Sequence, residues 1–175
     1  MLVLNDIQII GRCQSGMVEP FDKEMVNPAS IDIRIGDRLL IRRRRLTLKG
    51  WEGYWQQVDI SATTKEKPCW VKPETRFLTE SLETFNIPTD LVAQFRLKSS
   101  RGRELWEHLE AGFIDPGWHG SKLTMEVINH DLVARPIWKG MRFGQIYFMK
   151  TTPPIDCYGK TGRYNGDQGV QVSKG

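Results

Sequence analysis

The residue best placed to do chemistry is Glu126, in the middle of residues 122–129. Apolar residues alternate through this segment as they do in a β-strand, so Glu126 projects from the face opposite Met125 and Val127, among mostly uncharged neighbours. A carboxylate in such surroundings suits a general base or a proton shuttle near neutral pH. A glutamate on the solvated face of an edge strand would have the same spacing, so the pattern alone leaves both interpretations open.

A pair of hydroxyl groups, on Ser99 and Ser100, forms a second candidate site. The cations Lys98, Arg101 and Arg103 flank it. The serines precede apolar residues at helical spacing, which predicts a short helix within residues 99–109. Free backbone N–H groups at the start of a helix, together with cations, suit a phosphate group. A capped surface helix with solvated charges is the alternative.

A glycine-rich turn at residues 111–120 surrounds Asp115 with three glycines and one proline. Glycines of this kind allow the backbone to approach a ligand closely, and they also allow a tight hairpin. His119 in the same segment has no neighbouring His or Cys with which to form a metal site, so we interpret it as a turn residue.

Short apolar runs separated by Pro, Gly, Asn and Asp predict a chain built mainly from β-strands. One short helix is expected after Asn5, with its end near Gly11, and no later segment has the pattern of a long helix. These elements predict an all-β fold with a few short helices, either a sandwich or a distorted barrel. The predicted strands cover residues 30–35, 39–41, 77–78, 92–97, 123–128 and 143–149.

The length and hydropathy of the chain suit one compact unit. With 39% hydrophobic residues among 175, residues 1–175 are predicted to form a single domain. Residues 152–175 hold two prolines and five glycines but few apolar residues, and are predicted to form a flexible C-terminal arm. The N-terminus lacks a signal-peptide pattern and no stretch is long and apolar enough for a membrane span, so we expect a cytoplasmic protein without a membrane partner.

Charge and cysteine content bound the possible partners. The excess of 25 Lys and Arg over 21 Asp and Glu is mild and suits a small polyanionic ligand. The arginine run at residues 42–45 is interpreted as a solvated strand edge. Because the tryptophans are scattered along the sequence rather than interleaved as stacking platforms, we expect no nucleic-acid partner. Three separated cysteines without a C-x-x-C pair indicate reduced thiols and no zinc site.

Four motifs, in order along residues 27–169, resemble those of the dCTP deaminase family. Residues 27–36 resemble its PASIDLRLG strand, and residues 98–103 resemble its RSSLAR motif. Residues 111–129 are similar to its AGFIDPGF-G…LEL-N block, and residues 163–169 to its KYQGQ-GP arm. The resemblance implies a dUTPase-like distorted jelly-roll or β-barrel. It also implies a homotrimer with active sites at the subunit interfaces, each closed by a C-terminal arm.

The activity that the resemblance implies is the zinc-independent hydrolytic deamination of dCTP to dUTP and ammonia, in pyrimidine deoxynucleotide metabolism. Glu126 would be the general base that activates water, and Ser99 and Arg103 would position that water and its neighbours. Mg²⁺ would bind through the substrate triphosphate without protein side chains, and dTTP would act as an inhibitor. The substrate-binding residues implied by the resemblance are Lys98, Ser99, Ser100, Arg103, Asp115, Trp118, Tyr158, Arg163 and Gln168.

The sequence departs from the family pattern at several positions. Arg101 replaces the usual leucine and the following segment is one residue short, so either Arg101 or Arg103 could fill the catalytic arginine position. One residue is inserted after Gly120. Asp167 stands where the arm usually has glutamine, and an acidic group there would oppose a triphosphate unless a cation offsets its charge.

Three other functions fit the same motifs. A monofunctional dUTPase normally has an apolar residue at the position of Glu126, which favours deamination here. A bifunctional enzyme would convert dCTP to dUMP, and dUTP would then also be a substrate. A nucleotide-binding regulator with the same fold and no turnover is the non-enzymatic alternative.

Overall fold

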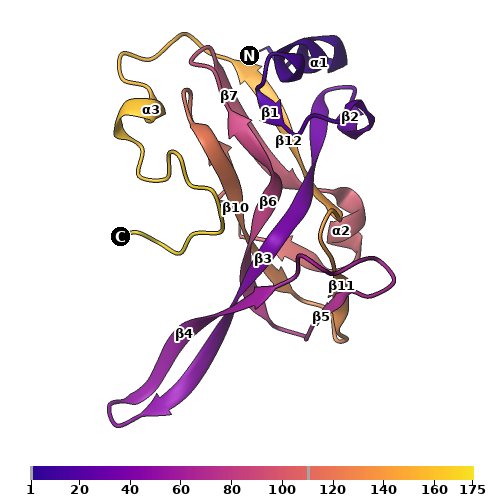
Figure 1. Cartoon of the computed structure of the whole chain (residues 1–175), viewed down its shortest axis with the longest axis vertical. Helices are drawn as coiled ribbons and strands as arrows, with labels where there is room; N and C mark the ends of the chain where they lie inside the picture. The colour runs from indigo at the N-terminus through magenta and orange to yellow at the C-terminus, as the bar shows by residue number, and fades with distance from the viewer. Residues whose placement is uncertain (1, 110) are drawn as a thin grey trace.

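Antiparallel β-strands make up most of the structure, a computed structural model that describes residues 2–109 and 111–175 (Figure 1). The strands are β1 (Val18–Glu19), β2 (Val26–Asn27), β3 (Ser30–Thr47), β4 (Gly50–Asp59), β5 (Cys69–Val71), β6 (Arg76–Asn86), β7 (Leu91–Leu97), β8 (Trp106–His108), β9 (Phe113–Ile114), β10 (His119–Asn129), β11 (Arg135–Ile137) and β12 (Arg142–Lys150). The helical segments are α1 (Asp6–Gln14), the 3₁₀ turn η1 (Lys23–Met25), α2 (Ser99–Arg103) and α3 (Tyr158–Thr161). Each predicted strand falls within one of these strands, and the all-β prediction is confirmed.

The long strand β3 joins the two halves of the main sheet. Its first part pairs with β12 and its second part with β6 and β4, with a register shift between Ile35 and Leu39. Gly36 lies at this shift, where a Cβ atom would come within 2.9 Å of the Ser81 carbonyl oxygen, so the close approach needs glycine. In the described residues the sheet runs β8-β10-β6-β3-β12-β7-β9 and curls into a half-barrel, as the distorted-barrel prediction requires.

Alternating apolar residues fill the inside of this curled sheet. On β10, Met125 and Val127 are fully buried while Glu126 between them is not, as the period of two predicts. Burying each large apolar side chain stabilises the fold by roughly 1.5–3 kcal/mol, so the core holds these strands in register. Phenylalanines from β6, β7 and β12 lie at its centre: Phe77, Phe85, Phe95, Phe143 and Phe148.

Helix α1 confirms the predicted N-terminal helix but not its predicted end. The Asn5 side chain accepts a hydrogen bond from Gln8 N (3.0 Å) and the Gln8 side chain accepts one from Asn5 N (3.1 Å), which forms a capping box. The helix continues through Gly11, where a methyl group would meet nothing within 4 Å, because an exposed glycine weakens a helix without stopping it. It ends instead before Gly16, whose positive φ of 89° reverses the chain.

Helix α2 is shorter than the predicted helix within residues 99–109. It ends at Arg103, Leu105 takes a left-handed φ of 61°, and the chain then enters β8. In β8 the inner side chains Trp106 and His108 alternate with an exposed glutamate. The helical interpretation is therefore wrong for residues 106–108, where the sheet ladder with β10 overrides the local spacing.

Two segments extend beyond the core sheet. The β3–β4 hairpin projects from one end of the molecule, and the arginines at residues 42–45 are exposed on it, as the interpretation as a solvated strand requires (Figure 1). The chain after β12 passes through α3 and runs beside β10 (Figure 1). Within residues 2–109 and 111–175, no helix has the length and hydropathy needed to cross a membrane.

An ion pair between Arg34 and Glu83 lies at the edge of the core. Glu83 is buried and accepts hydrogen bonds from Arg34 Nε (2.6 Å) and from the Arg34 backbone N–H (3.0 Å). Burial raises the pKa of the Glu83 carboxyl, while the hydrogen bonds and charge of Arg34 oppose that rise. Removing the cation would leave a buried carboxylate without compensation.

We expect Arg34→Met to lower the free energy of unfolding near neutral pH by roughly 3–5 kcal/mol, the usual cost of breaking a buried pair. Because the pKa of Glu83 is raised in the folded chain, its contribution to stability is fully present below its unfolded pKa and is lost as pH rises through the folded pKa. Without Arg34 the pKa of Glu83 rises further. The difference in unfolding free energy between Arg34→Met and the parent chain should therefore shrink as pH falls. Denaturant melts from neutral pH to about pH 4.5 measure this. The double variant Arg34→Met/Glu83→Gln is the control, and a deficit independent of pH would contradict the assignment.

Candidate active site

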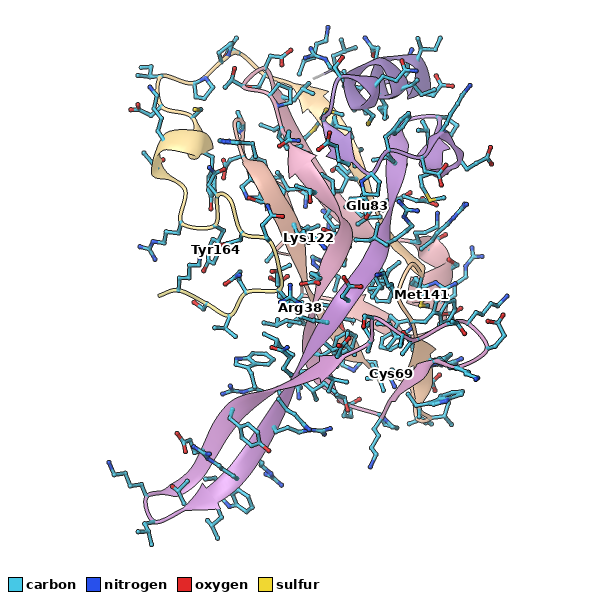
Figure 2. All side chains as sticks on the ribbon, in the orientation of Figure 1. Arg38, Cys69, Glu83, Lys122, Met141 and Tyr164 are labelled. Carbon is cyan, nitrogen blue, oxygen red and sulfur yellow. The ribbon has the colours of Figure 1, made fainter. Side chains whose placement is uncertain are left out.

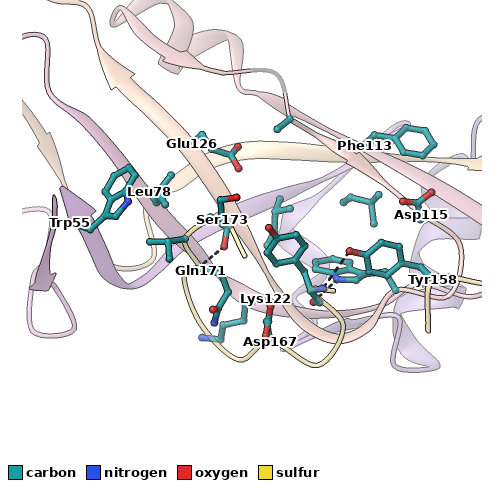
Figure 3. A pocket seen from close by; sticks show the side chains of 17 residues that line it. Trp55, Leu78, Phe113, Asp115, Lys122, Glu126, Tyr158, Asp167, Gln171 and Ser173 are labelled. Atoms are coloured by element: carbon teal, nitrogen blue, oxygen red, sulfur yellow. Dashed lines mark hydrogen bonds between the residues drawn. The ribbon is translucent and has the colours of Figure 1, made fainter. Parts of the chain in front are cut away.

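A cavity of about 490 Å³ lies between strand β10 and the C-terminal segment (Figure 3). Volumes of this size are usual for sites that bind small molecules. Lys122, Thr124 and Glu126 of β10 line one side of it, and Tyr158 and residues 171–173 of the C-terminal segment line another. The cavity therefore joins the strand that carries the predicted base to the segment predicted to be an arm.

Glu126 projects into this cavity from the middle of β10 (Figure 3). The strand register pairs Glu126 with Leu78 of β6. Cross-strand partners share a face of the sheet, so both side chains line the same wall of the cavity. The glutamate side chain is 28% exposed, but its Oε2 atom is buried and accepts no hydrogen bond from any residue that the structure describes. A partly buried carboxylate with one free oxygen can accept a proton from a bound water molecule.

His108 of β8 lies beside that free oxygen. Its Nε2 atom is 3.3 Å from Glu126 Oε2, although the two atoms are not aligned for a hydrogen bond. His108 is only 9% exposed, and its ring packs edge-on against Phe95 with centroids 4.7 Å apart. The imidazole is thus held where it can orient the carboxylate. The predicted site does not include His108, because a helical interpretation of residues 99–109 hides the strand alternation that turns this ring inward.

The glycine-rich turn places Asp115 and Trp118 at the cavity. Gly117 has a positive φ of 83°, which favours glycine, and it packs against Cys157 of the C-terminal segment. Trp118 stacks on Phe85 with centroids 5.7 Å apart, and its indole N–H donates a hydrogen bond to a carbonyl of the C-terminal segment. The turn joins β9 to β10, which pair with β7 and with β6 and β8 rather than with each other, so the hairpin interpretation is wrong, while the close approach of the C-terminal segment needs the glycine.

The C-terminal segment docks along β10 through its backbone. Figure 2 shows the part around Tyr164 running beside the strand near Lys122. Lys122 N donates a hydrogen bond to Asp167 O (2.8 Å). The Asp167 carboxylate pairs with Lys174, whose Nζ lies 2.7 Å from Oδ2. Lys174 is therefore the cation that offsets the negative charge of Asp167.

A buried carboxylate, that of Glu80 on β6, anchors the end of this segment. It accepts a hydrogen bond from Val170 N (2.7 Å) and pairs with Arg38, whose Nη2 lies 3.0 Å from Glu80 Oε2. Arg38 also donates a hydrogen bond to the carbonyl oxygen of Gln168 (3.3 Å). Gly169 fits between these groups, because a Cβ atom there would press on the Arg38 guanidinium and lie 3.1 Å from Glu80 Oε2. We call Arg38, Glu80 and Gly169 the arm clasp.

The structure brings together part of the predicted site. Glu126, Asp115, Trp118 and Tyr158 all line the cavity. The predicted residues that do not line it are Lys98, Ser99, Ser100, Arg103, Arg163 and Gln168. Ser99, Ser100 and Arg103 are exposed on α2, and Arg163 is exposed on the arm. Trp55, Lys122 and Tyr164 line the cavity without having been predicted, since only the tertiary structure places them beside Glu126.

The cations around α2 have different surroundings. Lys98 Nζ lies 2.5 Å from Oδ1 of the buried Asp32, so this ammonium neutralises a carboxylate of the framework. Arg101 Nη1 lies 2.6 Å from Glu104 Oε2. Arg103 forms no ion pair within the part of the chain that the structure describes, so it is the arginine with its guanidinium available to a ligand. In the same residues no cluster of three or more His, Cys, Asp or Glu side chains could hold a metal ion.

The fold and the cavity define a β-rich protein with a cavity of ligand-binding size on one face of its sheet. A family model described as dCTP deaminase-like matches residues 3–151, and the chain belongs to that family. It is 31% identical over 182 residues to the dUMP-forming dCTP deaminase of Mycobacterium marinum, across 99% of this chain and 95% of the relative. The dUMP-forming enzyme of Corynebacterium diphtheriae is 33% identical over 165 residues, across 90% of this chain and 87% of the relative.

A solved structure supports the fold. The crystal structure of 2'-deoxycytidine 5'-triphosphate deaminase from Agrobacterium tumefaciens matches with a TM-score of 0.68 and 20% sequence identity. The match covers 85% of this chain and 48% of the Agrobacterium chain, so the present chain spans about half of its length. At this identity the similarity concerns the arrangement of the strands.

We expect Gly169→Ala to loosen the arm clasp, because the added methyl group would displace Arg38 from Glu80. Limited proteolysis should then cut residues 152–175 faster, with little change in the melting temperature of the remaining sheet. Gly11→Ala is the matched control, since nothing lies within 4 Å of a methyl group there. Equal cleavage rates in the two variants would show that the clasp does not hold the arm.

Proposed function

We propose that this chain is a dCTP deaminase that uses Glu126 as its general base. The observation that carries the proposal is the placement of Glu126, whose buried Oε2 atom accepts no hydrogen bond from the described residues, in the wall of a cavity of about 490 Å³. The chain belongs to the dCTP deaminase-like family, and relatives that match nearly its whole length are named as dCTP deaminases, which supports the substrate.

The reaction replaces the amino group at C4 of cytosine with an oxygen from water, so that dCTP and water give dUTP and ammonia. Glu126 would take one proton from the water as its oxygen attacks C4, and would pass that proton to N3. The second proton of the water leaves with the amino group as ammonia, and the carboxylate is regenerated. His108, 3.3 Å from the carboxylate, would keep Glu126 oriented through these transfers.

The cavity of a single copy has too little positive charge for a triphosphate. Its ionisable lining consists of the carboxyl groups of Asp115, Glu126 and Asp167, the ammonium group of Lys122 and two tyrosines. The groups suited to phosphate, Ser99, Ser100 and Arg103, lie exposed on α2 outside this cavity. We therefore propose that a neighbouring copy in a homotrimer supplies α2 to each site.

The arm, residues 152–175, would act as the lid of this site within a single domain of residues 1–175. It carries Tyr158 in the cavity and the exposed Arg163, which would meet the phosphates when the lid closes. Mg²⁺ would enter with the substrate, because the described residues offer no ligand cluster of their own and the triphosphate oxygens are ligands that Mg²⁺ prefers.

A second candidate is a bifunctional enzyme that also hydrolyses the dUTP to dUMP and pyrophosphate. The relatives from Mycobacterium marinum, Streptomyces coelicolor and Corynebacterium diphtheriae are all named dUMP-forming, which favours it. Asp115 at the cavity would hold the water for that second step, while Glu126 would serve the first.

Incubating the purified chain with Mg²⁺ and either dCTP or dUTP, while measuring ammonia and pyrophosphate separately, tests both candidates. We expect one ammonia for each dCTP consumed. One pyrophosphate for each ammonia would assign the bifunctional reaction, and Asp115→Asn should then lose pyrophosphate release while ammonia release continues. Pyrophosphate from dUTP without any ammonia from dCTP would instead assign a monofunctional dUTPase. No release of either product would refute both candidates.

A further inference from the structure

The β3–β4 hairpin carries the whole net charge of the chain. Residues 40–58 contain five Lys or Arg residues and one acidic residue, a net charge of +4. The complete chain also has a formal net charge of +4, so the remaining 20 of 25 basic and 20 of 21 acidic residues balance. Because the hairpin projects from the sheet and its arginines are exposed, the chain presents one concentrated cationic ribbon (Figure 1). Such a ribbon attracts polyanions.

Strand pairing places tryptophan rings between arginines on one face of this ribbon. The register pairs Arg42 with Trp55 and Leu46 with Trp51, and cross-strand partners share a face. Arg44 lies on the same face, since alternate residues of a strand do so. The guanidinium carbons of Arg42 and Arg44 lie 5.1 and 4.8 Å from the ring centroids of Trp55 and Trp51. The expectation that the tryptophans form no stacking platform is therefore wrong for Trp51 and Trp55. We call the surface formed by Arg42, Arg44, Trp51 and Trp55 the Arg-Trp face.

The opposite face of the ribbon also has an arginine over an aromatic ring, since the Arg45 guanidinium carbon lies 5.6 Å from the Tyr54 centroid, but polar side chains engage its arginines. There Arg45 pairs with Glu52 at 3.1 Å, and Arg43 Nε donates a hydrogen bond to Gln56 (3.0 Å). The single carboxylate of residues 40–58 is thus on this face, and both arginines are engaged with it or with a neighbouring amide. The Arg-Trp face has no carboxylate of its own within residues 40–58.

We propose that the Arg-Trp face binds single-stranded nucleic acid. Arginines would contact successive phosphates, and bases would stack on Trp51, which is 67% exposed, and on Trp55. Arginines at alternate positions recur about every 7 Å along the strand, so an extended polymer meets them one after another. Cations and aromatic rings in alternation are the combination that holds single strands without sequence preference.

The spread of the rings along the ribbon favours a polymer over a membrane surface. Trp51 lies near the tip, and Trp55 lies four residues away, about 13 Å, where it also lines the Glu126 cavity. A membrane that contacts the tip at Leu48 would not reach Trp55, whereas a strand laid along the ribbon contacts both rings. The hairpin of a second copy would carry the same charge of +4 and be repelled.

Fluorescence anisotropy of a labelled single-stranded thymidine oligonucleotide, titrated with the full chain at several salt concentrations, tests the proposal. We expect saturable binding that weakens as salt rises. Trp51→Ala should weaken it about tenfold by removing a stacking surface. Tyr54→Ala is the matched control on the opposite face and should change it by less than about twofold. Arg44→Gln should lower the slope of log affinity against log salt by about 0.7, and more than Arg43→Gln does.

Circular dichroism and ammonia release from dCTP would check that each variant is folded, and Arg44→Gln replaces Trp51→Ala if that variant is not. Failure to bind the oligonucleotide at low salt would overturn the proposal. Equal effects of Trp51→Ala and Tyr54→Ala would overturn the choice of face. Binding to anionic phosphatidylglycerol vesicles but not to the oligonucleotide, or a change of oligomeric state in Trp51→Ala by light scattering, would assign the hairpin to a membrane or to a second copy instead.

Discussion

Strand β10 pairs with β6 in the register that sets Glu126 opposite Leu78, and the candidate site depends on that alignment. A slip by one residue would turn Glu126 into the core and bring Met125 and Val127 to the surface, because side chains alternate between the two faces of a strand. Burial of those two apolar residues therefore keeps the carboxylate at the cavity. The same strand pairs with β8, which brings His108 to Glu126, and its first half receives the arm.

The cations of the chain form two groups, one that pairs with buried carboxylates and one that is exposed. Arg34, Arg38 and Lys98 each neutralise a buried carboxylate, and an unpaired charge in those places would be costly. Arg103 on α2 and Arg42 and Arg44 on the β3–β4 hairpin are exposed instead. The framework group stabilises the sheet and holds the arm, while the exposed group is available to phosphates. This division explains how a chain with a mild charge excess can still expose cations on α2 and on the hairpin.

Strand periodicity in the sequence was enough to predict the all-β fold and the outward direction of Glu126, because both follow from which residues must be buried. The capped start of α1 was also predictable from Asn5. Local spacing failed at residues 106–108, where pairing with β10 makes a strand of a segment with helical spacing, and so His108 was missed. Trp55 and the clasp residue Arg38 reach the site or the arm only through contacts between distant segments, which no local pattern reports. The residues on α2 match the family motif, yet they lie outside the cavity of a single copy, and a local pattern cannot report the contact with a neighbouring copy that we propose.

The most direct test of Glu126 as the proton shuttle compares Glu126→Gln with the parent chain in equilibrium dCTP binding and in single-turnover ammonia release. Glutamine keeps the shape of the side chain but cannot accept a proton from water. Binding should change little, while the rate should fall by roughly 10²–10⁴, the usual contribution of a positioned acid–base group. Glu107→Gln, an exposed neighbour on β8, should leave both unchanged. Parental turnover in Glu126→Gln would contradict the account.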